Sequence, residues 1–141
     1  MSKKERLAQL FVVTIDSNSL KKKENILQSL SHKKGIGGLF FSKTNPLEQV
    51  QFINTYQNKF TTPLLVSMNA SNGLHKDIEA AYQYPNAYTL SKIKDVDLLS
   101  RMEGHIMEQL GIVGATVDLS VTTTNTSINK DQLNSLGIDQ V

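Results

Sequence analysis

The sequence predicts an α/β fold in which parallel strands alternate with helices. Short apolar runs rich in β-branched and aromatic residues recur along the 141-residue chain, and such runs are typical of buried strands. Between them lie longer segments in which apolar residues repeat every three or four positions, as in an amphipathic helix. Because a helix between two strands carries the chain back along the sheet, this alternation favours a parallel sheet.

The chain is predicted to begin with a short helix and a strand. Ser2 and Glu5 have the spacing of a capping box, in which each side chain accepts a hydrogen bond from the backbone amide of the other residue. The apolar run over residues 10–15 is predicted as a buried strand. Asp16 follows this run and begins a polar loop.

Two helices with a strand between them are predicted next. A helix over residues 20–34 is expected to stop at Gly35, since glycine tolerates the left-handed backbone of a helix end. A strand over residues 38–42 follows, and Asn45 and Pro46 then have the residue types that begin helices. The core side of this second helix is predicted to be Leu47, Val50, Ile53, Tyr56 and Phe60.

The second half of the chain repeats the pattern. The remaining predicted elements are a strand over residues 63–68, a polar loop over 69–73, a helix over 96–110, a strand over 115–121 and a polar tail over 122–127. In the last helix Met102 is expected on the core side instead of Glu103, and Gly111 is expected to be the stop. The right-handed crossover rule leaves two architectures, an open doubly wound sheet or part of an eight-stranded barrel. Such a barrel needs about 250 residues, so this chain is long enough for about half of one.

Composition excludes several classes of protein and of site. The chain has no cysteine, so it has no disulfide, thiolate zinc site, iron–sulfur cluster or cysteine nucleophile. Its formal net charge of +2 gives no reason to expect a nucleic-acid partner. No apolar run approaches the roughly 20 residues of a membrane-spanning helix. No signal peptide is visible, and the compartment is left open between cytoplasm and periplasm.

Five short segments occur in a fixed order along the chain. They are RLAQLF from residue 6, GIGGL from residue 35, PLLVSMN from residue 63, YP from residue 84 and EQLGI from residue 108. In this order they resemble the N-terminal domain of family 3 glycoside hydrolases, in particular the β-N-acetylhexosaminidase type. The resemblance implies that residues 1–141 form a single partial domain, equivalent to the first half of a TIM (β/α)8 barrel with about four strands. It also implies a sugar pocket at the carboxyl ends of the strands.

The resemblance further implies that the sugar-contacting loop is altered. The family has Ile-Asp-x-Glu-Gly-Gly after its third strand, and the Asp bonds hydroxyl groups of the sugar. Here Asn69 stands at the position of the Asp and Ser71 at that of the Glu, and Gly73 matches the family. An amide offers one acceptor and one donor group where a carboxylate offers two acceptors. The family's nucleophile and acid/base segments lie on later strands and are not among residues 1–141, so no catalytic residue is assigned.

Four residues are predicted to bind substrate. Asp16 and Asn69 follow the first and third strands, whose carboxyl ends share one edge of a parallel sheet, although Asp16 has an equally ordinary role as a loop or helix-capping residue. Asn72 lies in the altered loop and His75 directly after it, and ligand contacts concentrate on such loops. The alternative for His75 is a plain exposed loop histidine. No metal ion and no cofactor are expected.

Three functions remain open. The favoured one is a family 3-like domain without catalytic activity, which acts as a scaffold or retains binding of an N-acetylglucosamine- or glucose-type sugar. The second is part of an active glycosidase that further sequence or a partner chain completes. The third is an open-sheet module that binds a small molecule unrelated to sugars. Because a half-barrel exposes two sheet edges and an apolar face, we also expect self-association, cover from the tail, or attachment to a larger parent chain.

Overall fold

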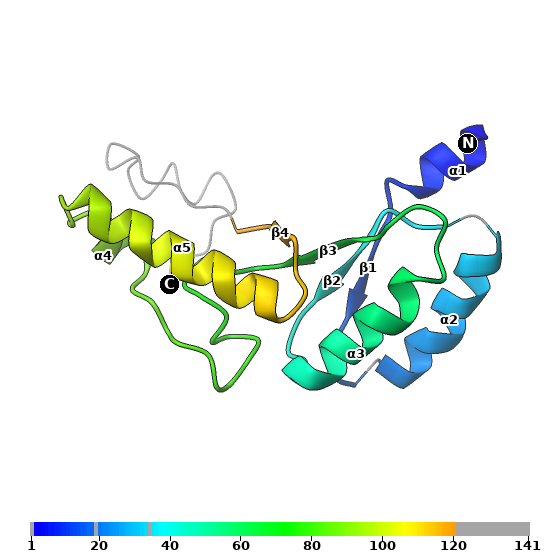
Figure 1. Cartoon of the computed structure of the whole chain (residues 1–141), viewed down its shortest axis with the longest axis horizontal. Helices are drawn as coiled ribbons and strands as arrows, with labels where there is room; N and C mark the ends of the chain where they lie inside the picture. The colour runs from blue at the N-terminus through cyan, green and yellow to red at the C-terminus, as the bar shows by residue number, and fades with distance from the viewer. Residues whose placement is uncertain (1, 19, 34, 121–141) are drawn as a thin grey trace, which may run out of the picture.

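The computed structural model describes residues 2–18, 20–33 and 35–120 and confirms the α/β prediction (Figure 1). Its helices are α1 (Lys3–Ala8), α2 (Leu20–Lys33), α3 (Pro46–Gln57), α4 (Ala87–Leu90) and α5 (Val96–Ile112). Its strands are β1 (Val12–Ile15), β2 (Gly38–Phe41), β3 (Leu65–Met68) and β4 (Val117–Asp118). The strands form one sheet in the order β1-β2-β3-β4, and every neighbouring pair is parallel.

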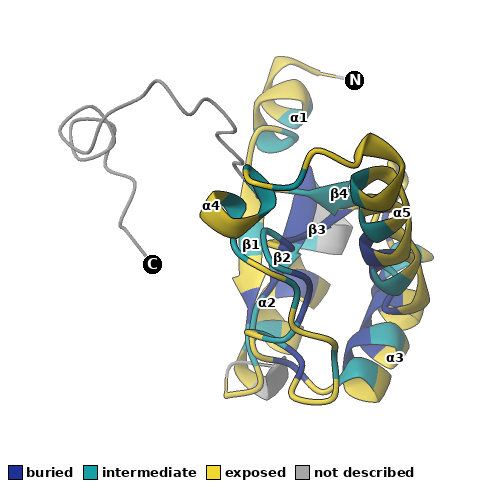
Figure 2. Cartoon of the chain, turned by 90° about the vertical axis from the view of Figure 1, so that its left-hand side faces the viewer, coloured by how far each residue is buried: buried dark blue, intermediate teal, exposed yellow. Residues whose placement is uncertain are grey.

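The strand order is sequential and never reverses within this sheet. Each connection therefore moves one strand further in the same direction, and right-handed crossovers then all fall on one face. Figure 2 shows α3 and α5 along one side of the sheet. Helix α2 joins them through Leu27, which is buried in the same core, and through the carbonyl oxygen of Glu24, which accepts the Tyr56 hydroxyl of α3. This is the arrangement of consecutive βα repeats in a barrel wall, in which helices cover only the outside.

The register separates the two faces of the sheet. Leu39 pairs with Val13 and Val66, and this row faces the helices. The next row on the opposite face joins Val12, Gly38 and Leu65. Leu65 is 60% exposed and Val12 is 52% exposed, whereas Leu39 and Val66 are buried. One face of the sheet is thus packed, and the other leaves apolar side chains in contact with solvent.

The core lies between the helices and the packed face. Its best-buried large side chains are Phe41, Ile15, Leu27, Leu39, Met68, Leu74 and Leu110. Phe41 of β2 meets Phe52 of α3 edge to face, with 6.0 Å between the ring centroids. Burial of each such side chain stabilises the fold by about 1.5–3 kcal/mol relative to leaving it in water. This core holds the carboxyl ends of the strands in fixed positions.

The helix caps agree with the sequence predictions at three places. Ser2 and Glu5 form the capping box of α1, and the Asn45 side chain accepts hydrogen bonds from the amides of Leu47 and Glu48 at the start of α3. Gly35 follows α2 with a φ of +73°. These three predictions are confirmed. They could be made from the sequence because each cap depends on residues close together in the chain.

The core side of α3 was predicted wrongly at Leu47. That residue is 66% exposed, and Gln49 is fully buried instead. The Gln49 side chain accepts a hydrogen bond from the Thr44 hydroxyl at 2.5 Å and donates one to the carbonyl oxygen of Val113 at 2.9 Å. A polar residue occupies this core position because both ends of its amide have partners, which removes the cost of burying it.

Several predicted strand boundaries are also wrong. The run over residues 10–15 contributes only Val12–Ile15 to β1, and Leu10 and Phe11 are exposed. The third strand begins at Leu65, two residues later than predicted. The fourth strand is confined to Val117–Asp118 of the described chain, and the predicted strand end at Val121 and the tail over 122–127 lie outside the described residues.

Helix α5 continues past Gly111, which was predicted as its stop. The turn comes at Gly114, whose φ is +76°. The amide of Ala115 donates to the carbonyl of Leu110 at 2.9 Å, and the amide of Gly114 donates to that of Gly111 at 3.1 Å. These two bonds make a Schellman motif, so the helix ends two residues later than predicted.

Two further features concern α5 and the segment before it. Met102 packs against the core and Glu103 is exposed, as predicted. Between the predicted loop over residues 69–73 and α5, where no element was predicted, the structure contains the short helix α4, which Asn86 caps. Both observations follow from local side-chain chemistry, since Asn favours helix N-caps and a charged residue stays in water.

Candidate functional site

The candidate site lies along the carboxyl-end edge of the sheet, which we call the rim. Asp16 follows β1, Ser42 follows β2 and Asn69 follows β3, so all three stand at this edge. Parallel α/β proteins bind their ligands at the carboxyl ends of the strands, where loops leave the sheet and backbone groups face solvent. The predicted sugar-binding residues are therefore expected to lie near one another along the rim.

Three of those residues share one loop, residues 69–75, which we call the rim loop. The Asn69 side-chain oxygen accepts a hydrogen bond from the amide of Ser71 at 3.1 Å. His75 Nδ1 lies 3.1 Å from the carbonyl oxygen of Asn72, and the same oxygen accepts the amide of Tyr84 at 3.0 Å. Asn69 is exposed, while Asn72 and His75 are half-buried. The rim loop is thus held by hydrogen bonds within it and by the amide of Tyr84, which lies outside it.

The tautomer of His75 follows from its partner. A carbonyl oxygen only accepts hydrogen bonds, so Nδ1 of a neutral His75 carries the hydrogen. Its Nε2 atom then has a lone pair that can accept a hydrogen bond from a hydroxyl group. His75 therefore offers an acceptor at the rim.

Gly73 makes the close packing of the rim loop possible. Its φ is +79°, and a Cβ atom there would lie 2.6 Å from the ring of Tyr84 and 2.7 Å from the carbonyl oxygen of Tyr82. Both distances are shorter than real Cβ contacts allow, and an L side chain rarely adopts this backbone conformation. Gly73 is also the residue of this loop that matches the family 3 pattern.

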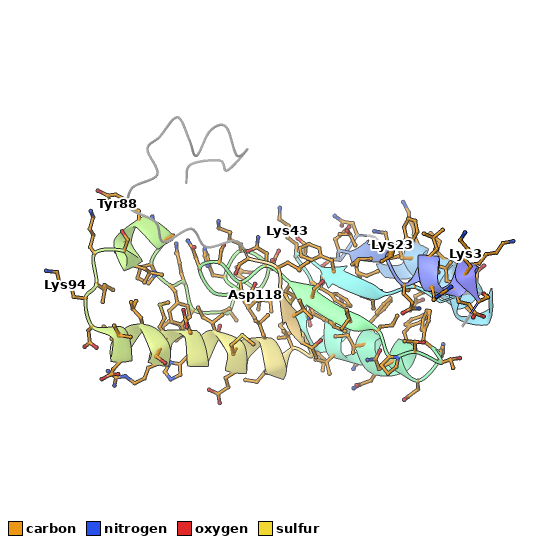
Figure 3. The ribbon with its side chains drawn as sticks, turned by 90° about the horizontal axis from the view of Figure 1, so that it is seen from above. Lys3, Lys23, Lys43, Tyr88, Lys94 and Asp118 are labelled. Carbon is orange, nitrogen blue, oxygen red and sulfur yellow. The ribbon has the colours of Figure 1, made fainter. Side chains whose placement is uncertain are left out.

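Asp118 fastens the rim loop to β4. Its carboxylate accepts hydrogen bonds from the amide of Ala70 at 3.0 Å and from the amide and hydroxyl of Ser120 at 2.8 and 2.7 Å. In Figure 3 Asp118 lies where the sheet meets the loops beyond β3. The sequence analysis did not select this residue. An acidic residue in the middle of the predicted strand over residues 115–121, two positions before a Ser that it can bond, was the available signal.

A cavity of about 560 Å³ opens beside the rim loop. It is lined by residues 43–46, which connect β2 to α3, and by residues 75–80. Asp77 joins the two segments, since its carboxylate accepts the Ser42 hydroxyl at 2.9 Å and the Lys43 amide at 3.0 Å. Lys43 itself has a φ of +51°, which is uncommon for a lysine. The hydrogen bonds to Asp77 hold this turn in place.

The cavity lining carries balanced charge. Lys43 and Lys76 contribute two positive groups, and Asp77 and Glu79 contribute two negative groups. A neutral His75 leaves the formal sum at zero. A small ion gains little from such a lining, whereas a neutral ligand with many hydroxyl groups finds donors and acceptors of both kinds.

Asp16 lies at the rim but apart from the rim loop. Its carboxylate accepts the amide of Asn18 at 3.0 Å, and β2 separates it from β3. Strands in a sheet are about 4.8 Å apart, so the ends of β1 and β3 are about 10 Å from each other. The structure thus brings Asn69, Asn72 and His75 together, places Asp16 across β2, and puts only His75 of the four in the cavity lining.

The carboxylates of the rim act as loop anchors. Asp77 and Asp118 each accept a hydrogen bond from a backbone amide of another loop, and Asp16 accepts one from the amide of Asn18 in its own loop. A retaining glycosidase instead needs two carboxyl groups about 5 Å apart that face the glycosidic bond. Within the described ranges, no group of three or more His, Asp or Glu side chains could hold a metal ion. None of the helices described is both long and apolar enough to cross a membrane.

Comparison with known proteins gives no family for this chain. No protein-family model matches it, and no curated protein matches it at a significant level. The resemblance to family 3 glycoside hydrolases therefore stays a prediction that rests on the five sequence segments and their order.

Proposed function

We propose that this chain binds a neutral carbohydrate at the rim and does not hydrolyse it. The observation that carries the proposal is the charge-balanced cavity of about 560 Å³ beside a polar rim loop. Its volume falls in the range of about 300–1,000 Å³ that is usual for small-molecule sites. The family 3 resemblance narrows the ligand to an N-acetylglucosamine- or glucose-type sugar.

The rim residues supply complementary hydrogen-bonding groups for such a sugar. His75 Nε2 is an acceptor for one hydroxyl group, and the Asn69 amide nitrogen is a surface donor for a hydroxyl or acetamido oxygen. Asp16 lies farther along the same edge and would contact a second sugar unit. An elongated ligand along the rim fits these positions better than a single small ring.

The absence of hydrolysis is proposed from the partners of the carboxylates. A general acid or nucleophile has to be aimed at the bond that breaks, whereas Asp77 and Asp118 accept hydrogen bonds from the backbone amides of Lys43 and Ala70, which lie in other loops. If further sequence or a partner chain completed the barrel, new carboxylates could take those roles. That second candidate predicts release of a chromogenic group from an aryl N-acetylglucosaminide.

The third candidate, an open-sheet binding module, has less support. Ligands of doubly wound sheets sit in the crevice where the strand order reverses. The order β1-β2-β3-β4 contains no such reversal. A ligand of this chain would instead bind above a continuous wall of strands, as proposed for the rim.

Titration with N-acetylglucosamine and its β-1,4-linked dimer, followed by NMR amide shifts, tests the proposal. We expect saturable shifts in residues 69–80, with the dimer bound more tightly than the monomer. The variant His75→Ala removes one hydrogen bond of about 1 kcal/mol and should weaken binding about fivefold. His105→Ala is the matched control, because His105 is exposed on α5. Absence of saturable shifts in the folded wild-type chain would refute sugar binding.

A further inference from the structure

We infer that Tyr82 is a stacking platform for a sugar unit that extends beyond the cavity, which gives the rim a second position for a pyranose ring. This inference rests on the proposed sugar binding and adds a subsite to it. Three features of the structure support it: the exposure of the Tyr82 ring, the place of this residue just past the cavity lining, and the contacts that hold its backbone against the rim loop.

The Tyr82 ring is largely uncovered. Tyr82 is 77% exposed, whereas Tyr56 in the core is 4% exposed. A phenol ring has a flat apolar face with negative charge in its π cloud. The C–H groups on the flat side of a pyranose ring carry partial positive charge, because the neighbouring oxygen atoms polarise them, so they are attracted to such a face. A sugar ring on Tyr82 would also remove apolar area from water.

Tyr82 lies close to the cavity without lining it. The last residue of the lining is Ala80, two positions earlier, and two trans peptide units separate Cα atoms by at most about 7.6 Å. The Tyr82 ring is thus placed to meet the part of a ligand that leaves the cavity. Asp16 is a separate position, since β2 lies between its strand and β3. The ligand class that fits is a neutral oligosaccharide of at least two pyranose units.

The backbone of Tyr82 is held against the rim loop. The amide of Tyr84 donates to the carbonyl oxygen of Asn72 at 3.0 Å. The Tyr82 carbonyl oxygen itself would lie 2.7 Å from a Cβ atom at Gly73, so the two backbones are in close contact. A ligand then has to order mainly the side chain, and a tyrosine has only two side-chain torsions to fix. The entropy cost of stacking on this ring is therefore small.

Tyr88 provides a matched control. It is 73% exposed, nearly as much as Tyr82, but it belongs to α4, and the ammonium group of Lys92 lies 5.0 Å from the centre of its ring. Figure 3 shows Tyr88 far from Asp118, which fastens the rim loop. Loss of this second exposed ring should therefore leave a ligand at the rim unaffected.

NMR titration of the chain with N-acetylglucosamine and its β-1,4-linked dimer tests the inference. Protons above a tyrosine ring experience its ring current, so we expect C–H protons of one unit of the bound dimer to shift upfield. Tyr82→Ala should abolish this shift and weaken dimer binding about fivefold, with monomer binding unchanged. Tyr82→Phe keeps the ring face and should keep both the shift and the affinity. Tyr88→Ala should behave as the wild-type chain does.

The outcomes separate this subsite from the proposed function. If the folded wild-type chain binds neither sugar, sugar binding is refuted and the subsite with it. If the chain binds both sugars but Tyr82→Ala binds the dimer as tightly as the wild type, or Tyr88→Ala weakens it equally, only the platform is refuted. Both side chains are exposed, so the variants should fold, which circular dichroism can verify.

Discussion

Adding one methyl group at Gly73 should distort the rim loop more than any other small change near the site. The alanine Cβ would lie 2.6 Å from the Tyr84 ring and 2.7 Å from the Tyr82 carbonyl oxygen. The Tyr82 oxygen is backbone, so it cannot move aside as the end of a side chain can. The loop must therefore shift away from the residues that follow it, and this shift displaces the segment that begins at His75.

The size of the effect can be worked out from the backbone and the contacts. An L residue in the left-handed region costs about 1–2 kcal/mol, and excess volume in a packed site costs about 1–3 kcal/mol. Alanine also restricts the unfolded chain, which offsets about 0.4–1 kcal/mol of this cost. Gly73→Ala should therefore lower the free energy of unfolding by about 1–5 kcal/mol, which is a large part of the stability of a typical domain.

Gly104→Ala is the matched control for this substitution. Gly104 is exposed in the middle of α5, and a Cβ there meets no atom within 4 Å. The change should raise the free energy of unfolding by about 1 kcal/mol, because alanine favours a helix more than glycine does. Urea unfolding followed by circular dichroism measures both variants. If Gly73→Ala is as harmless as Gly104→Ala, the rim loop is not packed against Tyr84 and the reasoning fails.

Three further outcomes test other parts of the structure. Asp118→Ala should lower the free energy of unfolding by about 1–3 kcal/mol and speed hydrogen exchange of the Ala70 amide, whereas Asp118→Asn, which keeps an acceptor, should lower it less. Equal exchange rates of the Ala70 amide in both variants would contradict the anchoring role. Burial, with a smaller contribution from Glu24, raises the pKa of Tyr56, so the unfolded chain loses the phenol proton at lower pH than the folded chain does. The protonated phenol therefore stabilises the fold fully below about pH 10, and this stabilisation disappears as the pH rises through the folded pKa. Tyr56→Phe should flatten the resulting alkaline decline of the urea unfolding midpoint. Phe41→Ala should cost about 3–5 kcal/mol in thermal or urea unfolding, because Phe41 is fully buried; a loss below 1 kcal/mol would show that the core is not packed as described.

The sequence predicted features that depend on neighbours along the chain. The capping box of Ser2 and Glu5, the Asn45 cap and the stop at Gly35 all involve residues within a few positions of one another. The order of strands and helices also followed from local periodicity, and the parallel sheet followed from that order. The clustering of Asn69, Asn72 and His75 was predictable for the same reason, since they lie within one short loop.

Features that depend on distant parts of the chain were missed. Gln49 is buried on α3 because its partner Val113 lies at the far end of α5, and the spacing of apolar residues on α3 alone favoured Leu47. Asp118 was not selected because its contact with the rim loop is a bond from the amide of Ala70, which is 48 positions away in the chain. Leu10 and Phe11 are apolar but exposed, since no described element covers the amino end of β1.

What the amino-acid sequence determined by itself is the set of local elements, their order, and hence an α/β chain with parallel strands. Hydrogen bonds within a few residues and the periodic burial of apolar side chains are sufficient for this. Only the tertiary structure decided which face of the sheet is covered, which carboxylates anchor the rim, and where a cavity opens between residues 43–46 and 75–80. These properties arise when segments far apart in the chain meet, and no local pattern records which segments will do so.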